Sequence, residues 1–365
     1  MTLDDRALRL FTLPDALRPA RILHAPHNIG GNPVGLSRAE RELGFRSDVL
    51  VLEQHPFGYE ADIDLRLGRW PQPAATVKRG IWALRSLPAY DVFHFNFGQT
   101  IYQRLDRRGR LHTELPWLKR MGKRVLVTFQ GDDVRPPEAN PFAGYSREGL
   151  TLQERFQVRR RDALLRYADR IFFLNPDLRH WLPGAEFRPY SSVNPRTIRP
   201  SPLPDREETV VAHAPSHREQ KGSERIIAAV DALKAEGVPI RLSLIEGVSR
   251  GRALELTREA HIVVDQLNLG WYGGYAVEAM AIGRPVLCYI REEESDDNPW
   301  GDELPIVRTS AKTFRDDLRA LIADPGRMRR AASEGPSFVE QHHDPVRIAR
   351  QNLEGLIPFP GGDRR

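Results

Sequence analysis

The sequence predicts an α/β protein with two Rossmann-like domains whose parallel sheets face a central cleft. Three observations lead to this prediction. Apolar runs of about four to six residues alternate with helical patterns along the chain, as expected for parallel strands that helices cover on both faces. A proline-rich stretch interrupts the alternation at 199–205, and the pattern then restarts. A length of 365 residues is long for one domain and enough for two.

The first domain is expected to span residues 1–198. Its short apolar runs predict strands, and the patterned stretches between them predict helices. The expected strands are 21–25, 47–52, 91–95, 124–129, 170–174 and 186–189, and the expected helices are 34–43, 77–87 and 152–167. Pro200, Pro202 and Pro204 lie among polar neighbours and predict a linker at 199–208.

The second domain is expected to span residues 209–342, followed by a terminal helix and tail at 343–365. Its first helix is justified by Ile226, Val230 and Leu233, which share one face. The expected helices are 223–236, 252–259, 313–322 and 344–356, and the expected strands are 209–214, 240–245, 262–264, 284–289 and 305–307. Ligands bind beyond the C-terminal ends of strands in such sheets, so the cleft between the domains is the expected site.

The composition is that of a globular protein from a reducing compartment. Hydrophobic residues make up 40% of the chain, and no apolar run reaches membrane-spanning length. The first residues are acidic and lack the apolar core of a signal peptide. The single cysteine, Cys288, excludes an internal disulfide. No histidines and cysteines have metal-ligand spacing. We therefore expect a cytoplasmic protein without a bound metal.

The chain is basic, with 54 lysine and arginine residues and a net charge of +5. This balance favours phosphates or anionic surfaces, but no nucleic-acid-binding signature is present, so nucleic acid is not an expected partner. Basic residues concentrate at 155–166 and at 104–124, the latter around Leu115, Trp117 and Leu118. These stretches fit either peripheral contact with the inner face of a membrane or solvated helix faces.

The glycine-rich stretch 267–286 carries the strongest functional signal. A helix is expected to begin near Gly274, and its unpaired first amides and dipole form an anion site. Gly273 and Gly274 let a phosphate approach the backbone closely. Glu278 lies one turn further, where a carboxylate suits a sugar diol. An ordinary helix–turn–strand unit is the alternative. Neighbouring aromatic residues are candidates to stack on the ligand or to pack the loop: Trp271, Tyr272 and Tyr275.

Two further loops of the second domain carry candidate donor-binding residues. Arg218 and Lys221 lie just before a helix, where cations are unfavourable unless an anion binds there. Both side chains suit a diphosphate, and a solvated loop is the alternative. Ser216 precedes them in the same loop. Glu246 and Gly247 follow the strand 240–245 and would border the same pocket or form a plain turn.

Candidates in the first domain follow its strands. Gly30, Gly31 and Asn32 join the first strand to the first helix, which offers free amides or makes a tight turn. His94 fits either a substrate-orienting histidine or a core histidine. The remaining candidates follow the strand 124–129: Gln130, Asp132 and Asp133. The two aspartates would bind acceptor hydroxyls, cap a helix or coordinate a metal, and adjacent carboxylates on a loop are usually caps or solvated.

These residues resemble those of the GT-B glycosyltransferases that use nucleotide sugars and retain the anomeric configuration, the family 4 or "glycosyl transferases group 1" type. The resemblance covers nearly the whole chain and is carried by Lys221-Gly222, by Ala260–Val264, and by Glu278-Ala279-Met280-Ala281 with Gly283, Pro285 and Val286, which matches an E-A-M-A-x-G-x-P-V signature. It implies a GT-B fold whose C-terminal helix crosses back to the first domain.

The resemblance also implies roles. Lys221, Arg218 and the loop amides would stabilise the departing diphosphate, Glu278 would hold the ribose, and Gly30 and Gly31 would approach the donor. The nucleotide-diphosphate sugar is a co-substrate, and the resemblance implies no other cofactor and no metal. The acceptor would be a hydroxyl on a carbohydrate, a lipid-linked molecule or a small molecule.

The sequence departs from the family pattern at three places. Gly270 stands where the family has a glutamate that contacts the donor sugar. Ser216 and Pro215 stand where the family often has an arginine, and Arg218 is the nearest substitute. Gln130 stands where a histidine is common, and His94 is a candidate for part of that role. These departures keep a second hypothesis open, a non-catalytic glycosyltransferase-like protein that binds nucleotide or glycan.

Overall fold

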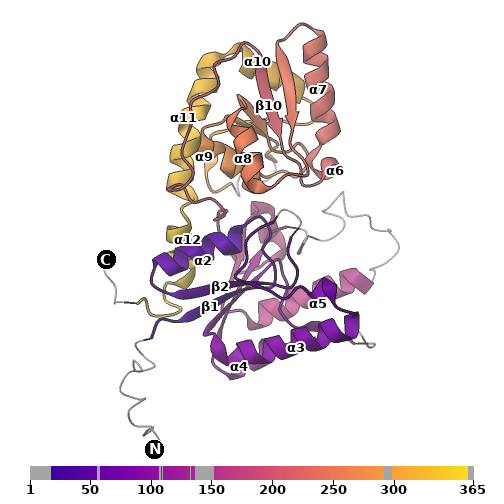
Figure 1. Cartoon of the computed structure of the whole chain (residues 1–365), viewed down its shortest axis with the longest axis vertical. Coiled ribbons are helices and arrows are strands. Elements are labelled where there is room, and N and C mark those ends of the chain that lie inside the picture. The colour runs from indigo at the N-terminus through magenta and orange to yellow at the C-terminus, as the bar shows by residue number, and fades with distance from the viewer. Residues whose placement is uncertain are drawn as a thin grey trace, which may run out of the picture.

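The chain folds into two α/β lobes, one above the other in Figure 1. The computed structural model describes residues 18–55, 58–106, 108, 110–131, 133–135, 152–291 and 298–360. The strands of the first sheet all precede residue 188, and those of the second sheet lie between 209 and 308. The predicted α/β class with two parallel sheets is confirmed.

The first lobe is built on a seven-stranded sheet in the order β3-β2-β1-β4-β7-β8-β9, and every pair of neighbours is parallel. Its strands are β1 (Arg21–Ala25), β2 (Arg46–Val51), β3 (Ile63–Asp64), β4 (Val92–Asn96), β7 (Arg124–Phe129), β8 (Arg170–Phe173) and β9 (Glu186–Phe187). Its helices are α2 (Asn32–Glu42), α3 (Gln72–Ala89), α4 (Leu115–Arg120) and α5 (Leu152–Tyr167). Every residue of β4 is buried, as expected for a central strand covered on both faces.

The second lobe is built on a five-stranded parallel sheet in the order β11-β10-β12-β13-β14. Its strands are β10 (Thr209–His213), β11 (Ile240–Leu244), β12 (Ile262–Val264), β13 (Val286–Cys288) and β14 (Ile306–Arg308). Its helices are α6 (Arg218–Lys221), α7 (Ser223–Ala235), α8 (Arg250–Arg258), α9 (Gly274–Ile282), α10 (Phe314–Ala323) and α11 (Pro325–His342). Apolar side chains of α7 and α10 pack on one face of the sheet, and those of α9 and α11 pack on the other.

Each sheet has one point where the strand order reverses, between β1 and β4 in the first lobe and between β10 and β12 in the second. Crevices at such points bind ligands in doubly wound folds, because loops leave the two neighbouring strands in opposite directions. In the second lobe the flanking segments are 214–222, which includes α6 and Lys221, and 265–273, which is the glycine-rich loop. The fold therefore brings these two sequence motifs to one edge.

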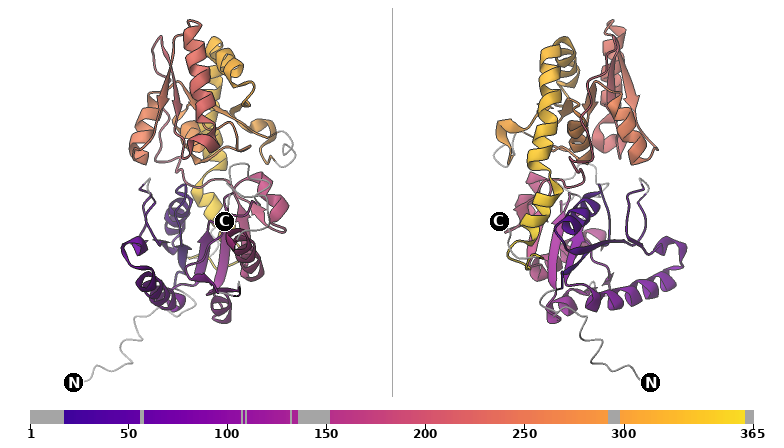
Figure 2. Two further views of the ribbon diagram at one scale, coloured as in Figure 1. Left: turned by 90° about the vertical axis from the view of Figure 1, so that its right-hand side faces the viewer. Right: turned by 60° about the vertical axis from the view of Figure 1, so that its left-hand side comes forward.

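The C-terminal helix α12 (Pro345–Leu353) returns to the first lobe, as predicted. Its Ile348 and Ala349 pack against Leu36 and Ala39 of α2. Arg170, at the start of β8, donates hydrogen bonds to backbone carbonyls at the end of α12. The two views of Figure 2 show α11 alongside the second lobe and the chain continuing from it into the first.

Several elements were not predicted. The patterns miss β3, α4, α6, α11 and the antiparallel hairpin of β5 (Gln103–Leu105) and β6 (Leu111–Thr113). Helix α11 contains Gly335 and Pro336, which are poor helix formers and obscure its pattern. A Cβ at Gly335 would lie 2.9 Å from the carbonyl oxygen of Met280, so close packing on α9 requires glycine there. No helix among the described residues is both long and apolar enough to cross a bilayer.

Candidate functional site

A cavity of about 270 Å³ lies between the two lobes. Loops that follow β1 and β2 border it from the first lobe, and loops that follow β10 and β11 together with the start of α9 border it from the second. Eight residues predicted to bind the donor line it: Gly30, Ser216, Lys221, Glu246, Gly247, Gly274, Tyr275 and Glu278. The carboxyl ends of both sheets thus meet at one concave site, where sequence reasoning placed the ligand.

Lys221 is held at the cavity by a buried carboxylate. Its Nζ donates to Oδ1 of Asp265 at 3.0 Å, and the Asp265 side chain is fully buried. The other oxygen of Asp265 accepts the backbone N–H of Gly273 at 2.6 Å. A Cβ at Gly273 would lie 3.3 Å from the Lys221 ammonium, so a side chain there would crowd it. Asp265 therefore fixes both the lysine and the glycine-rich loop in one arrangement.

The amino-terminal end of α9 opens into the same cavity. Gly274 is the first residue of this helix, and Gly273 before it supplies no side-chain cap. The first amides of a helix have no partner inside the helix, and they carry the positive end of its dipole. Lys221 lies beside this helix start, because it neighbours Gly273. Cation and amides together make a site for an anion.

Glu278 lies one turn inside α9 and also lines the cavity. Its Oε1 accepts a hydrogen bond from Nε of Arg250 at 2.5 Å, and Arg250 also donates to the carbonyl oxygen of Ser192 in the first lobe. Burial raises the pKa of Glu278, while Arg250 opposes that shift. The carboxylate is thus partly desolvated and positioned by a cation, which suits recognition of hydroxyl groups.

Arg218 forms a bidentate ion pair with Glu246. This pair raises the pKa of Arg218 and lowers the pKa of Glu246. Glu246 and Gly247 line the cavity, whereas Arg218 is exposed and does not line it. Arg218 therefore contacts Glu246 from the solvent side, whereas Lys221 lines the cavity itself.

Sequence reasoning missed three polar side chains that line the cavity. His55 and Tyr59 come from the loop after β2, and Arg250 comes from the first turn of α8. Burial raises the pKa of Tyr59, and the nearby Glu278 adds to that shift. The loop after β2 has no glycine or charge pattern that identifies a site, so only the strand order brings it to the cavity. Arg250 follows Ser249, whose side chain caps α8, and that N-cap was its one visible signal.

Trp271 and Tyr272 lie in the core instead of the cavity. They are 7% and 1% exposed and belong to the cluster that packs β13 against α9. The hydroxyl of Tyr272 accepts a hydrogen bond from Trp300 Nε1 at 2.9 Å and contacts His343. Their side chains pack the loop, which was one of the two expected roles, and they are not placed to stack on a ligand in this cavity.

The glycine-rich loop is shaped by a residue that no motif indicated. Gln266 is fully buried, and its side-chain oxygen accepts the backbone N–H groups of Asn268 and Leu269, both at 2.6 Å. Its Nε2 donates to the carbonyl oxygens of Trp271 and Tyr289. This one side chain therefore forms hydrogen bonds with backbone groups on both sides of Gly270. The φ of Gly270 is +79°, which favours glycine.

The Asn32 side chain forms a hydrogen bond with the backbone of the first lobe. Its Oδ1 accepts the N–H of Ser191 at 2.8 Å, and the side chain is 2% exposed. Gly31 caps α2 with φ of +75° and borders a second cavity between the lobes, of about 740 Å³. Of the three residues predicted in this loop, only Gly30 lines the cavity that contains Lys221.

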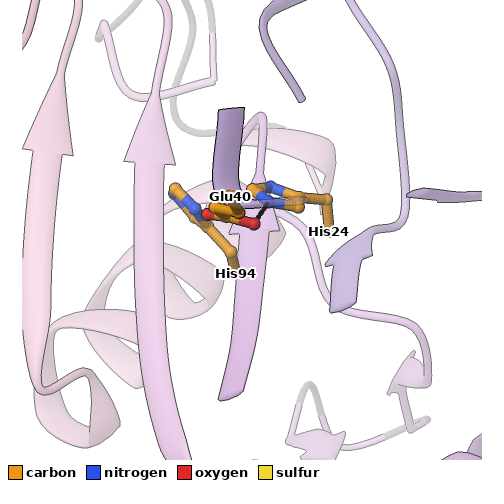
Figure 3. Close-up of side chains that lie close together, drawn as sticks. All are labelled: His24, Glu40 and His94. Atoms are coloured by element: carbon orange, nitrogen blue, oxygen red, sulfur yellow. Dashed lines mark hydrogen bonds and ion pairs between the residues drawn. The ribbon is translucent and has the colours of Figure 1, made fainter. Parts of the chain in front are cut away.

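His94 lies in the core of the first lobe, close to His24 and Glu40 (Figure 3). Its Nε2 contacts the Thr128 hydroxyl at 2.7 Å, and burial lowers its pKa well below the usual value. His24 Nε2 lies 2.9 Å from Glu40, which also accepts the Ser47 hydroxyl. The side chains of His24, Glu40 and His94 offer ligand atoms within 4.8 Å of one another, but none lines the cavity that contains Lys221. This placement matches the core role for His94.

Gln130 and Asp133 form a backbone turn after β7. The Asp133 carboxylate accepts the N–H groups of Gln130 and Gly131, and burial raises its pKa to about 6. The carbonyl oxygen of Gln130 accepts a hydrogen bond from Asn175. Asp133 is 2% exposed and caps this turn, so it does not present its carboxylate to an acceptor. Asp132 lies outside the described residues.

No protein-family model matches the chain, and no curated protein matches its sequence. Solved structures do match. Sucrose-phosphate synthase from Thermosynechococcus elongatus aligns over 92% of this chain and 97% of its own, with a TM-score of 0.62 and 16% identity. An α-glucosyltransferase in complex with UDP and a DNA 13-mer aligns over 92% and 99%, with a TM-score of 0.56 and 12% identity.

A UDP-N-acetylglucosamine 2-epimerase aligns over 93% of this chain and 95% of its own, with a TM-score of 0.54 and 15% identity. At this level of identity the similarity shows the fold alone. The chain therefore has the two-domain GT-B fold expected from the sequence, including the crossing helix α12.

Proposed function

We propose that this protein is a glycosyltransferase that moves a sugar from a nucleotide-diphosphate donor to an acceptor hydroxyl, with retention of configuration and without a metal. The observation that carries the proposal is the anion site formed by the Lys221 ammonium and the start of α9. Glu278 lies one helical turn away in the same cavity, at the place a ribose diol would occupy beside a bound diphosphate.

In the proposed reaction the bond between the anomeric carbon and the diphosphate oxygen breaks, and negative charge develops on the diphosphate. Lys221 and the first amides of α9 stabilise that charge, and preorganised electrostatic stabilisation of this kind is usually the largest catalytic contribution. Asp265 maintains the preorganisation, because one carboxylate binds both Lys221 and Gly273. The acceptor hydroxyl attacks from the face that the diphosphate leaves and gives its proton to the departing diphosphate oxygen, so the new bond forms with retention of configuration.

Other residues in and beside the cavity act around this centre. Arg218 orients Glu246, whose loop borders the cavity where the base would lie. Gly30 and Tyr59 approach from the first lobe, so closure of the two lobes would exclude water from the donor. The acceptor is a hydroxyl of a carbohydrate, a lipid-linked molecule or a small molecule, which the lining of the first lobe selects.

A second candidate is a glycosyltransferase-like protein that binds nucleotide or glycan without turnover. The observation that favours it is Gly270, which replaces the glutamate that contacts the donor sugar in the family the chain resembles. Gly270 has φ of +79°, and a Cβ there would meet the Arg291 side chain at 3.1 Å. The positive φ and the close Arg291 side chain therefore disfavour glutamate at this position, and other contacts would hold the sugar.

The deciding experiment incubates the purified chain with UDP-, GDP-, ADP-, dTDP- and CDP-sugars, without acceptor and with added EDTA. We expect one donor to raise the melting temperature and to be hydrolysed slowly, and both effects to be lost in Lys221→Ala. The anomer released, followed by NMR, reports retention. Binding without hydrolysis would favour the binding protein, and isomerisation of the intact donor would identify an epimerase.

A further inference from the structure

The large apolar side chains that the described residues expose are concentrated on one face of the first lobe. They lie on α3 or just before it, on α4 or just after it, and on α5: Trp70, Val77, Ile81, Leu84, Trp117, Met121 and Val158. No such side chain is exposed in the described part of the second lobe. We call the surface formed by α3, α4 and α5 the basal face. Figures 1 and 2 show α3 and α4 at the end of the first lobe farthest from the second.

Helix α3 turns an apolar stripe outward, although its Leu87 and Trp82 pack on the core. Val77, Ile81 and Leu84 follow an i, i+4, i+7 spacing and are 61%, 47% and 70% exposed. A surface helix of a globular protein ordinarily turns such a stripe toward the core. The buried positions of α3 include Ala75 and Ala83, which are small. Burial within this chain therefore does not account for the outward stripe.

A groove of about 1030 Å³ continues the stripe between α3, α4 and α5. Leu84 and Leu87 line it from α3, Trp117 and Met121 from the region of α4, and Tyr167 from the end of α5. Exposed Trp117 and Met121 stand at its edge. Large exposed apolar side chains that are clustered, instead of scattered singly, indicate an interaction site.

The charge of the basal face indicates the chemical class of its partner. Neither α3 nor α4 contains an acidic residue, while Lys78, Arg85 and Arg120 are interleaved with their apolar positions. The Lys78 ammonium lies 5.0 Å from the ring centre of Trp70, and the Arg120 guanidinium lies 5.4 Å from that of Trp117. Tryptophan beside a cation is typical of the interface between lipid headgroups and acyl chains.

We propose that the basal face docks on an anionic lipid surface, with Leu84 and Trp117 entering the interface and Arg85 and Arg120 contacting the headgroups. The outward apolar stripe and the predominantly basic charge together carry this inference, because a partner protein requires only the first. On α5, Asp162 lines the groove but is outnumbered by Arg159, Arg160, Arg161 and Arg166. The cavity between the lobes lies away from this face, so it stays open while the protein is docked. The inference does not depend on the proposed glycosyl transfer.

The test is co-sedimentation of the purified full chain with phosphatidylcholine vesicles, with and without about one third phosphatidylglycerol. We expect binding only to the anionic vesicles, weakened as salt rises from about 50 to 300 mM, because screening shortens the reach of the charges. Leu84→Ser/Trp117→Ser should lower the bound fraction at least tenfold. Both side chains are exposed, so the variant should keep its melting temperature.

The matched charge variants are Arg85→Glu/Arg120→Glu on the basal face and Lys312→Glu/Arg329→Glu on the exposed surface of the second lobe. Only the first pair should abolish vesicle binding at equal net charge. No binding to anionic vesicles at low salt, or equal loss in both pairs, would overturn the proposal. A dimer that Leu84→Ser/Trp117→Ser dissociates, without vesicle binding, would assign the face to a second copy of the chain.

Discussion

The two edges of the cleft use their polar residues in opposite ways. On the second lobe, Lys221 and Glu278 line the cavity with their charged groups positioned by Asp265 and Arg250. On the first lobe, the charged Asp133 closes a turn of its own backbone, and His94 lies in the core. The charged groups of the second lobe therefore line the cavity, whereas Asp133 of the first lobe bonds its own backbone.

This difference teaches where local sequence is sufficient. A phosphate site at a helix start needs residues that are close together in the chain, such as Gly273, Gly274 and Glu278, so their spacing indicates where such a site can lie. The direction of a strand residue depends on which neighbours cover each face. His94 pairs in register with His24, and that contact between β1 and β4 determines its burial.

The largest expected effect is that of Lys221→Ala. We expect kcat/KM for donor turnover to fall at least 100-fold, about 2.7 kcal/mol, because the leaving diphosphate loses its cation. Steady-state kinetics measure it. Asp265 remains buried without its partner, so the melting temperature falls as well. Lys221→Arg, which restores the charge, should recover more of the lost melting temperature than of the lost kcat/KM.

His94→Asn is the matched variant in the first lobe. It removes the contact with Thr128 and should lower the melting temperature while leaving kcat within about twofold. A loss of kcat as large as that of Lys221→Ala, in folded protein, would contradict the contrast between the two edges and return His94 to the site.

The two lobes should also respond to pH in opposite directions. Burial raises the pKa of Glu114 in the first lobe to about 7, above its unfolded value, so its contribution to stability is lost as pH rises through about 7. Burial lowers the pKa of His213 in the second lobe to about 4, so its contribution is present above about 6.5 and lost as pH falls through about 4.

Glu114→Gln tests the first half of this prediction. The free energy of unfolding of the variant should equal that of the native chain at pH 5 and exceed it at pH 8, by an amount on the order of 2 kcal/mol. Urea unfolding at pH 5, 6, 7 and 8 measures the difference. The amide still accepts the N–H of Tyr102, so the gain should be absent at pH 5. A difference that does not change with pH would show that Glu114 does not titrate in this range.

The sequence was sufficient for the α/β class and the two sheets, and it indicated eight of the residues that line the cavity, because apolar periodicity and glycine spacing are local. It was insufficient for Arg250 and Tyr59, which reach the cavity only through the strand order. It also missed Asp265, whose position at the end of β12 looks like any strand terminus. Gly335 and Pro336 concealed α11, since tertiary packing on α9 overrides their low helix propensity.

A smaller effect is expected for Glu278→Gln. Removing the charge should weaken donor binding about tenfold, about 1.4 kcal/mol, because a charged acceptor binds hydroxyl groups more strongly than an amide. Calorimetric titration of the nucleotide measures it. Arg250→Met tests whether Arg250 contacts the donor itself or only positions Glu278. If Arg250 only positions Glu278, the double variant should bind no more weakly than Glu278→Gln alone.

The smallest expected effect is that of Gly270→Ala, which tests the departure from the family pattern. The residue has φ of +79°, and a Cβ would contact Arg291 at 3.1 Å, so we expect a loss of about 1 kcal/mol in the free energy of unfolding. Gly251→Ala in α8 is the control, because its Cβ meets nothing within 4 Å and its φ is not positive; it should be neutral or stabilising. If Gly270→Ala keeps both stability and turnover, backbone strain does not require glycine here. The loop could then accept a side chain toward the sugar, and the absence of the glutamate would reflect donor choice.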